Sequence, residues 1–315
     1  MKGSGTLIIL YQNILNLSNI LMENLVNKLV LGTAQLGLDY GINNQNGKPT
    51  RESAMEMLDF AYKNGIKIFD TAYAYGNAEE ILGEFLRGQN LGEEIKIITK
   101  INPGSPEDVS LEIKKSLEKL GLSSVDGCLF HNPEHIKNER MVETMSELKK
   151  QGLAKNIGVS VYEPEDAVYS AKIGEIDYIQ IPYNIFDQRL SKTDFFELAQ
   201  KNNKKVFARS AFLQGLLLMP IGKIPARLES ARPHLAKLDA IIAKYGLSKK
   251  QVAMNFALAN KNIDYIVFGA DNKNQLKEVI DIAKQEIDFN QCKKELEKEF
   301  DKVEKYIISP NLWQK

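Results

Sequence analysis

The chain has 315 residues, of which 43% are hydrophobic and 26% charged, close to the average of soluble globular proteins. Its 41 basic residues balance 41 acidic ones, so no overall field draws it to nucleic acid or to a membrane surface. Two distant cysteines, Cys128 and Cys292, and only three histidines provide neither a disulfide framework nor a typical zinc site. We therefore expect no metal, no nucleic-acid or membrane partner, and a reducing, cytoplasmic location.

Residues 1–21 stand apart from the pattern that follows. The apolar stretch 7–11 is too short to span a bilayer, and it lacks the flanks of a secretory signal. Met22 is a plausible second start. We expect residues 1–21 to form a flexible N-terminal appendage, and residues 22–315 to form one domain with a C-terminal helical extension near 290–305.

From Leu25 onward, short β-branched runs alternate with amphipathic stretches of helical period. Thr50 is a predicted N-cap, Gly65, Gly121 and Gly152 are predicted stops, and Ser248 with Gln251 forms a capping box. In chain order the predicted elements are strand 28–31 and a helix from Thr50, strand 66–69 and helix 77–87, strand 95–99 and helix 106–120, strand 126–130 and helix 139–150, strand 156–159 and helix 164–173, strand 178–182 and helix 193–202, strand 205–208 and helices 234–245 and 249–259, and strand 265–268 and helix 274–283.

Eight strand–helix units in alternation indicate a parallel sheet with helical crossovers. A doubly wound open sheet is the competing architecture, but its dinucleotide-binding form carries GxGxxG after an early strand. The first strand is followed instead by Gly32-Thr33-Ala34-Gln35-Leu36-Gly37. We therefore predict an α/β fold in which the units close into a single-domain (β/α)8 TIM barrel.

Active sites of such barrels lie where strands end, and four titratable residues follow three consecutive predicted strands. They are Asp70, Tyr75, Lys100 and His131. Each alone has a plain structural explanation: a helix cap, one of twelve tyrosines, a lysine reaching to solvent, and a core histidine. Together they are suited to one reaction, so we take them as the candidate catalytic residues.

Reduction of a carbonyl by hydride transfer requires a proton donor at the developing alkoxide. A free tyrosine, with a pKa of about 10, is a weak acid at neutral pH. We expect Lys100 to lower the pKa of Tyr75, the general acid, and Asp70 to hold the lysine in place. His131 would donate a hydrogen bond to the substrate oxygen and so orient it.

The motifs around these residues resemble those of the aldo-keto reductase family over nearly the whole chain from Leu25. They are Phe69-Asp70-Thr71-Ala72-Tyr73-Ala74-Tyr75-Gly76, Ile98-Thr99-Lys100 and Leu129-Phe130-His131-Asn132-Pro133. The resemblance implies a (β/α)8 barrel, an extended nicotinamide cofactor at the C-terminal mouth of the barrel, and no metal.

The resemblance also implies a cofactor-binding set. Ser160 and Gln180 match residues that bond the nicotinamide amide, and Trp313 lies in a segment that often borders the substrate. The remaining positions belong to the first loop, the pyrophosphate loop and the adenosine-phosphate segment: Gly32, Thr33, Ala34, Asp70, Ser210, Gly215, Gly269, Ala270, Asp271, Lys273 and Gln275.

The sequence departs from the family pattern both at positions expected near the nicotinamide and at positions expected near the adenosine phosphate. Val161 replaces a common asparagine, and Arg209 replaces a tyrosine that stacks on the nicotinamide, adding a positive charge there. Gly269 and Gln275 stand where a lysine and an arginine often clasp the 2′-phosphate, although Lys273 is available as a point charge. We expect a relaxed preference in which NADPH is used and NADH is possible.

The leading functional hypothesis is the NAD(P)H-dependent reduction of an aldehyde or ketone, sugar-like in one version, to an alcohol. Two alternatives remain open: a sugar or polyol dehydrogenase running in the oxidative direction, and a cofactor-binding regulatory or scaffold subunit with little turnover. The expected partner is a small-molecule carbonyl substrate, and the expected state is a monomer or a small homo-oligomer.

Overall fold

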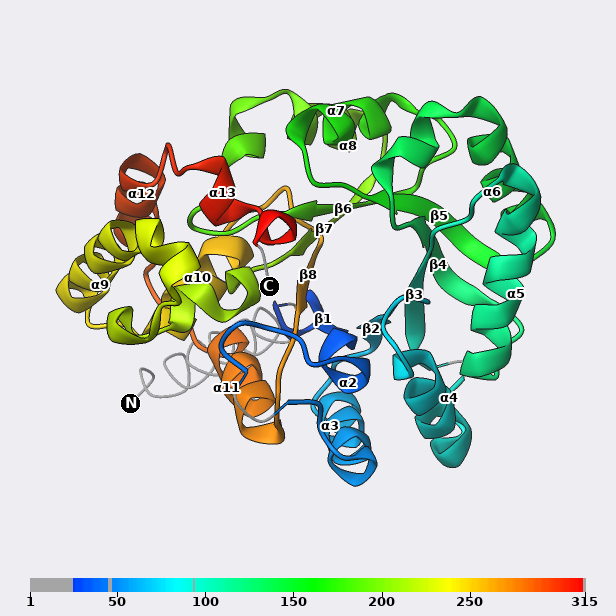
Figure 1. Ribbon diagram of the computed structural model, residues 1–315, viewed down its shortest axis with the longest axis horizontal. Helices are drawn as coiled ribbons and strands as arrows, with labels where there is room; N and C mark the ends of the chain where they lie inside the picture. The colour runs from blue at the N-terminus through cyan, green and yellow to red at the C-terminus, as the bar shows by residue number, and fades with distance from the viewer. Residues whose placement is uncertain (1–24, 45–46, 93, 314–315) are drawn as a thin grey trace, which may run out of the picture.

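Eight parallel strands close into a barrel in which each pairs with its neighbour in sequence and β8 returns to β1 (Figure 1). The computed structural model describes residues 25–44, 47–92 and 94–313, so the expected appendage 1–21 lies outside the described residues. The predicted (β/α)8 barrel is confirmed. The strands are β1 Leu29–Gly32, β2 Ile68–Asp70, β3 Lys96–Ile101, β4 Val125–Phe130, β5 Ala154–Ser160, β6 Tyr178–Pro182, β7 Lys205–Arg209 and β8 Tyr265–Phe268.

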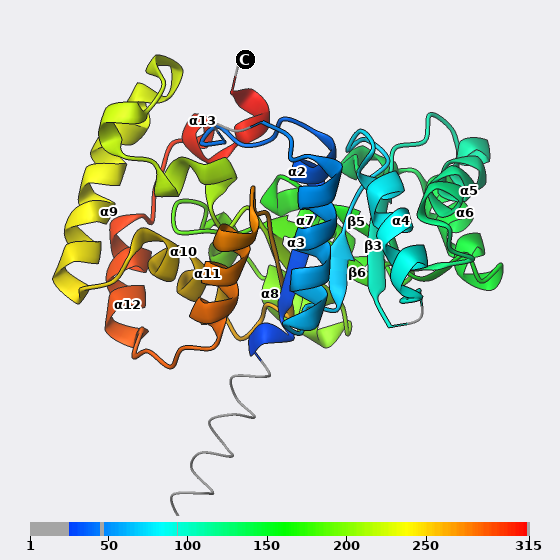
Figure 2. The same ribbon diagram turned by 90° about the horizontal axis from the view of Figure 1, so that it is seen from below.

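Helices surround the barrel and connect successive strands (Figures 1 and 2). They are α2 Ala34–Gly37, α3 Arg51–Lys63, α4 Ala78–Gln89, α5 Val109–Leu120, α6 Glu139–Lys150, α7 Pro164–Lys172, α8 Phe195–Lys201, α9 Arg232–Tyr245, α10 Lys249–Leu258, α11 Lys273–Ala283, α12 Asn290–Glu299 and α13 Lys305–Ile308. Short 3₁₀ turns fill the β7–α9 connection at Leu213–Leu218, Ile221–Lys223 and Ala226–Ala231.

Local sequence signals fix several helix ends as predicted. The Thr50 side chain accepts a hydrogen bond from the Ser53 amide, and Ser248 and Gln251 form a reciprocal capping box. Gly121 ends α5 in the left-handed conformation at φ 66°, which glycine adopts without steric cost. The expected extension at 290–305 is instead two helices, α12 and α13, separated by a non-helical stretch at 300–304.

Alternate residues of the strands fill the interior of the barrel. Inward side chains from seven strands form an apolar cluster separate from the main core. Its members are Val30, Ile68, Ile98, Leu129, Tyr178, Phe207 and Val267. On β5 the same level is occupied by Gly158, where an added Cβ would lie 2.1 Å from the Tyr178 carbonyl oxygen. This layer closes the barrel beneath its C-terminal mouth.

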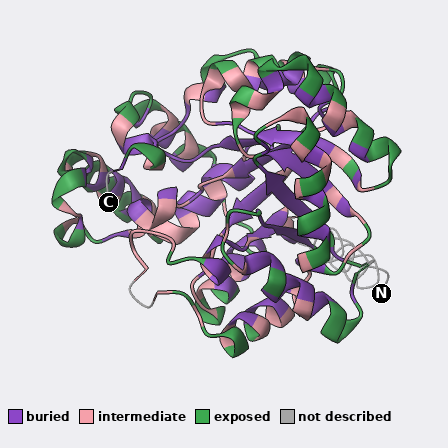
Figure 3. Ribbon diagram, turned by 45° about the vertical axis from the view of Figure 1, so that its right-hand side comes forward, coloured by how far each residue is buried: buried purple, intermediate pink, exposed green. Residues whose placement is uncertain are grey.

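The residues between these inward positions face the helices. Phe69, Phe130, Val159 and Ile179 are fully buried in the main hydrophobic core, between the barrel and its ring of helices. Figure 3 shows the same division, with buried strands at the centre and exposed residues on the outer faces of the helices and in the connecting loops. The period-two pattern of each strand therefore separates two cores, one inside the barrel and one outside.

Helices α4 and α5 approach closely at Gly83. An added Cβ there would lie 2.3 Å from the Lys119 carbonyl oxygen and 2.8 Å from Leu120 backbone atoms. Gly88, in the same helix, is exposed, and a Cβ there would meet nothing within 4 Å. Gly83 is therefore required by the close packing of α4 against α5, whereas Gly88 is not.

We expect Gly83→Ala to destabilise the barrel by about 1–3 kcal/mol, because the methyl group forces two helix backbones apart. The matched variant Gly88→Ala should be neutral or stabilise by up to about 1 kcal/mol through its higher helix propensity. Urea unfolding of both variants measures the difference. Equal stabilities would contradict the close packing of α4 against α5.

Candidate active site

At the inward position two residues beyond the apolar layer, six strands of the barrel carry a polar side chain, and β1 and β8 carry a glycine. The spacing follows from the strand period, because residues i and i+2 share a face. From β1 to β8 these residues are Gly32, Asp70, Lys100, His131, Ser160, Gln180, Arg209 and Gly269. Seven of them, all except Lys100, line a cavity of about 700 Å³ at the C-terminal mouth.

The structure brings the four candidate catalytic residues together. Lys100 Nζ lies 2.6 Å from Asp70 Oδ1, 2.9 Å from the Thr71 carbonyl oxygen and 3.4 Å from Tyr75 Oη. Lys100 and Asp70 are almost entirely buried, at 1% and 3% exposure, so their pairing is shielded from water. The rings of Tyr75 and His131 meet edge to face, with centroids 5.8 Å apart.

The electrostatics of Tyr75 differ from the expectation. Burial of the hydroxyl and the nearby Asp70 carboxylate raise the pKa of Tyr75 above its ordinary value, and the Arg209 charge opposes them only in part. The pKa of Tyr75 is therefore raised rather than lowered as expected, because burial and the Asp70 carboxylate outweigh the positive charge of Arg209. Tyr75 consequently holds its proton firmly at neutral pH, in the state that a proton donor requires.

His131 is neutral in this environment. Burial, followed by the positive charges of Lys100 and Arg209, lowers the pKa of His131 to about 4. A neutral imidazole keeps one N–H donor and one acceptor nitrogen. The ring can therefore donate a hydrogen bond to a carbonyl oxygen while adding no formal charge to the cavity.

A chain of hydrogen bonds joins the expected carboxamide-binding residues to this centre. Ser160 Oγ donates to Gln180 Oε1 at 3.3 Å, and Gln180 Nε2 donates to Asp70 Oδ2 at 2.7 Å. Asp70 thus accepts from Lys100 with one oxygen and from Gln180 with the other. The side chains of β2, β3, β5 and β6 are oriented as one unit.

The remaining expected cofactor residues divide into two groups. Ala34, Ser210, Gly215, Asp271 and Gln275 line the cavity together with the strand-end residues above. Thr33 is fully buried and donates to the Asp70 carbonyl oxygen, and Ala270 is also buried outside the lining. Lys273 is exposed, with its ammonium 5.2 Å from the Phe60 ring centroid, so it too lies outside the lining.

At the far end of the cavity, two lysines that sequence analysis missed join the β8–α11 loop. Gln275 fixes this loop by accepting from the Asp271 amide at 3.0 Å and donating to Asp271 Oδ2 at 3.2 Å. Lys249 and Lys250, in the first turn of α10, line the same end, and the Lys250 charge opposes the rise in the pKa of Asp271 that burial causes. The sequence predicted the start of α10 from Ser248 and Gln251. No local sequence pattern indicates that this end of the helix lies beside the β8–α11 loop.

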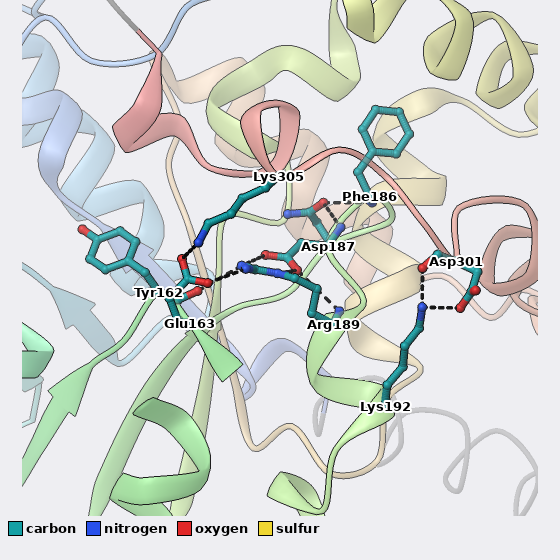
Figure 4. Close-up of polar contacts among 9 residues, drawn as sticks. Tyr162, Glu163, Phe186, Asp187, Arg189, Lys192, Asp301 and Lys305 are labelled. Carbon is teal, nitrogen blue, oxygen red and sulfur yellow. Dashed lines mark hydrogen bonds and ion pairs between the residues drawn. The ribbon is translucent and has the colours of Figure 1, made fainter. Parts of the chain in front are cut away.

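The C-terminal segment borders the cavity through Pro310 and Asn311. Figure 2 shows this segment on the same end of the barrel as the strand-end loops. Glu163, in the β5–α7 loop, holds it through Lys305 at 2.9 Å while also pairing with Arg189 at 2.9 Å (Figure 4). Trp313, the expected border residue, is instead buried, with its indole N–H bonded to the Tyr306 carbonyl oxygen, and lies outside the lining.

The donor set of the cavity fits an extended dinucleotide. Neutral amide and hydroxyl groups, from Ser160 and Gln180, lie beside the Tyr75–His131 pair and suit a carboxamide. Lysines and the N-terminus of α10 lie toward the other end, where backbone N–H groups favour phosphate. In the part of the chain that the structure describes, no three His, Cys, Asp or Glu side chains gather as metal ligands. None of the described helices is long and apolar enough to cross a membrane.

Comparison with known proteins agrees with this architecture. The model of the aldo/keto reductase family matches residues 28–297. The chain is 25% identical to the NADH-specific methylglyoxal reductase of Escherichia coli K12, over 80% of this chain and 88% of that protein. It is 26% identical to the L-glyceraldehyde 3-phosphate reductase of the same organism, over 91% and 92%. A crystal structure from Pseudomonas aeruginosa assigned to the aldo-keto reductases superimposes with a TM-score of 0.64 at 23% identity, covering 82% and 90%.

We expect the His131 ring to titrate near pH 4 rather than near its ordinary value of about 6.5, and so to stay neutral from pH 5 to 8. NMR of the ring protons measures this directly, and a His131→Asn variant assigns the signal among three histidines. A midpoint near pH 6.5 would show that the ring is neither desolvated nor close to the two cations.

Proposed function

Because the chain belongs to the aldo/keto reductase family, we propose that it reduces the carbonyl group of a small aldehyde or ketone to an alcohol with a nicotinamide cofactor. The observation that carries the proposal is the buried contact of Lys100 with both Asp70 and Tyr75, at the mouth of a cavity of about 700 Å³, with His131 against the Tyr75 ring. A cavity of this volume accommodates a cofactor portion and a small substrate together.

A reduced nicotinamide, held by Ser160 and Gln180, would supply the hydride that the carbonyl carbon accepts. Tyr75 gives its phenolic proton to the carbonyl oxygen as the C=O π bond breaks, so that an alcohol is formed. His131 donates a hydrogen bond to the same oxygen and fixes its position. Lys100 stabilises the tyrosinate left by the proton transfer, and a proton from solvent restores Tyr75.

Asp70 acts through Lys100 rather than on the substrate. Its carboxylate orients the ammonium with one oxygen and the Gln180 amide with the other. Ser160 and Gln180 would hold the carboxamide of the cofactor, and Gly32, Ala34 and Ser210 would line its path. Ser210 and the loop to Gly215 would lie along the pyrophosphate.

The substrate we favour is a small polar aldehyde. This rests on relatives named for methylglyoxal and L-glyceraldehyde 3-phosphate, and on the polar lining around Tyr75. The oxidative and scaffold alternatives predict other behaviour: faster turnover of an alcohol with the oxidised cofactor, or tight cofactor binding without turnover.

We expect Tyr75→Phe to lower kcat for carbonyl reduction by a factor of about 10²–10⁴, the usual contribution of general acid catalysis. Cofactor affinity should change little, because the ring is retained. Lys100→Met should also suppress turnover, but it leaves the Asp70 carboxylate buried without its ion-pair partner and therefore reduces stability as well. Steady-state rates with NADH and NADPH over a panel of aldehydes measure both. Near-normal turnover of Tyr75→Phe would exclude this mechanism.

Cofactor preference is set at the β8–α11 end of the cavity. Asp271 would repel a 2′-phosphate and accept a hydrogen bond from a ribose hydroxyl. Lys250 is the nearby cation, but it is already paired with Glu278. We therefore propose a relaxed preference, in which NADPH is used and exceeds NADH in affinity by less than about a hundredfold, since a charged hydrogen bond contributes about 1.5–3 kcal/mol.

We expect Lys250→Met to shift the ratio of the two dissociation constants toward NADH by about tenfold, and Asp271→Asn to shift it toward NADPH, as removal of each charge requires. Fluorescence titration of both reduced cofactors measures the ratio. A wild-type preference for NADPH above a thousandfold would mean that another cation clasps the phosphate, and would overturn this account of the loop.

A further inference from the structure

Arg209 is the cavity-lining cation without a carboxylate partner among the residues that the structure describes. Its Nη2 donates to the Val161 carbonyl oxygen at 2.9 Å and its Nη1 to Ser210 Oγ at 3.3 Å, both neutral groups. The other cations at the cavity are paired with Asp70, Asp239 and Glu278. The charge of Arg209 is therefore not neutralised locally.

Neighbouring groups hold the guanidinium in place. It stacks on the Tyr162 ring at 4.4 Å from the centroid. The backbone at Tyr162 is itself fixed, because Arg189 Nη2 donates to its carbonyl oxygen at 3.0 Å. Figure 4 shows that Arg189 also forms ion pairs with Glu163 and Asp187. Lys305, in the C-terminal segment, forms a further ion pair with Glu163. Arg209 thus rests on a cross-linked loop and cannot swing into solvent without losing these contacts.

The field of this cation reaches the reacting groups. The Arg209 charge acts to lower the pKa of Tyr75 and of His131, whose rings are in edge-to-face contact. Any ring positioned to deliver hydride beside these two side chains lies in the same field. Oxidised nicotinamide carries a positive charge on its ring, whereas the reduced ring is neutral. A fixed, half-buried cation therefore acts unequally on the two oxidation states.

We propose that Arg209 selects the oxidation state of the cofactor, so that the site holds the reduced dinucleotide in preference to the oxidised one. This inference rests on the proposed function, since it requires a nicotinamide beside Tyr75 and His131. The site would load reduced cofactor from a mixed pool and release the oxidised product readily, so that little oxidised dinucleotide would block the site. Each tenfold increase in the affinity for the reduced over the oxidised form raises the reduction potential of the bound nicotinamide couple by about 30 mV.

The test is the ratio of dissociation constants for the oxidised and reduced forms of one dinucleotide, NADP⁺ against NADPH and NAD⁺ against NADH. Wild-type protein should bind the reduced form at least about tenfold more tightly, as expected for a unit charge within several ångströms at an intermediate dielectric. Arg209→Met should lower the ratio by about tenfold, chiefly by tightening the oxidised form. A purely structural role would weaken both forms equally.

Two variants serve as controls. Arg209→Lys keeps the charge and should keep most of the ratio. Lys250→Met removes a cation at the other end of the cavity and should leave the oxidised-to-reduced ratio unchanged, because both forms carry the same phosphates there. The pKa of His131 should rise in Arg209→Met, which reports the lost charge independently of any cofactor.

The outcomes separate this inference from the proposed function. If both forms bind wild-type protein with ratios near one, or if Arg209→Met leaves a large ratio intact, the selection by Arg209 is overturned while the reductase function stands. If neither form binds, the proposed function fails and the inference fails with it. If Arg209→Met does not fold, Arg209→Gln replaces it in the same comparison, and a wild-type ratio near one overturns the selection without any variant.

Discussion

The active site depends on one constraint, the period of two residues along eight strands that are closed into a barrel. Closure forces every inward side chain into a shared interior, so each strand contributes to the same layers. Ile68, Ile98 and Phe207 belong to the apolar layer, and Asp70, Lys100 and Arg209 stand two residues further on. A slip of one residue in a strand that carries a polar inward group would turn that group away from the interior. The register of the barrel is therefore also the register of the site.

The buried pair of Asp70 and Lys100 illustrates what this arrangement costs. Removing two charges from water is unfavourable unless each finds enough partners. Here the ammonium contacts the carboxylate, the Thr71 carbonyl oxygen and Tyr75 Oη, and the carboxylate gains Gln180 as a second donor. The pair is better understood as a device for orientation than as a source of stability. It fixes the Tyr75 hydroxyl relative to β2, β3 and β6 at once.

Sequence patterns predicted the strand ends well, because alternation and turn residues are local properties. Asp70, Lys100 and His131 could be assigned to one mouth from the sequence, since parallel strands end at the same side, whereas Gln180 was expected there only through the family resemblance. Lys250 could not be assigned, because its closeness to Asp271 depends on how α10 packs beside β8. The shift in the pKa of Tyr75 was also beyond the sequence, which shows the neighbouring lysine but not the depth of burial.

The two ends of the cavity use positive charge differently. Lys249 and Lys250 are each paired with a carboxylate, Asp239 and Glu278 respectively, so a phosphate must compete with an existing partner and gains less than from a free cation. Arg209 is held by neutral oxygens and an aromatic ring, and it keeps its full charge beside the reacting groups.

Because the chain as a whole has no net charge, long-range attraction contributes little, and recognition falls to these local arrangements. In the proposed function, the paired lysines at the adenosine end would admit either dinucleotide, whereas Arg209, which has no carboxylate partner among the described residues, would discriminate by the charge of the nicotinamide ring. The proposed loose selection of the phosphate and strict selection of the oxidation state would thus follow from one difference, which is whether the cation is already paired with a carboxylate.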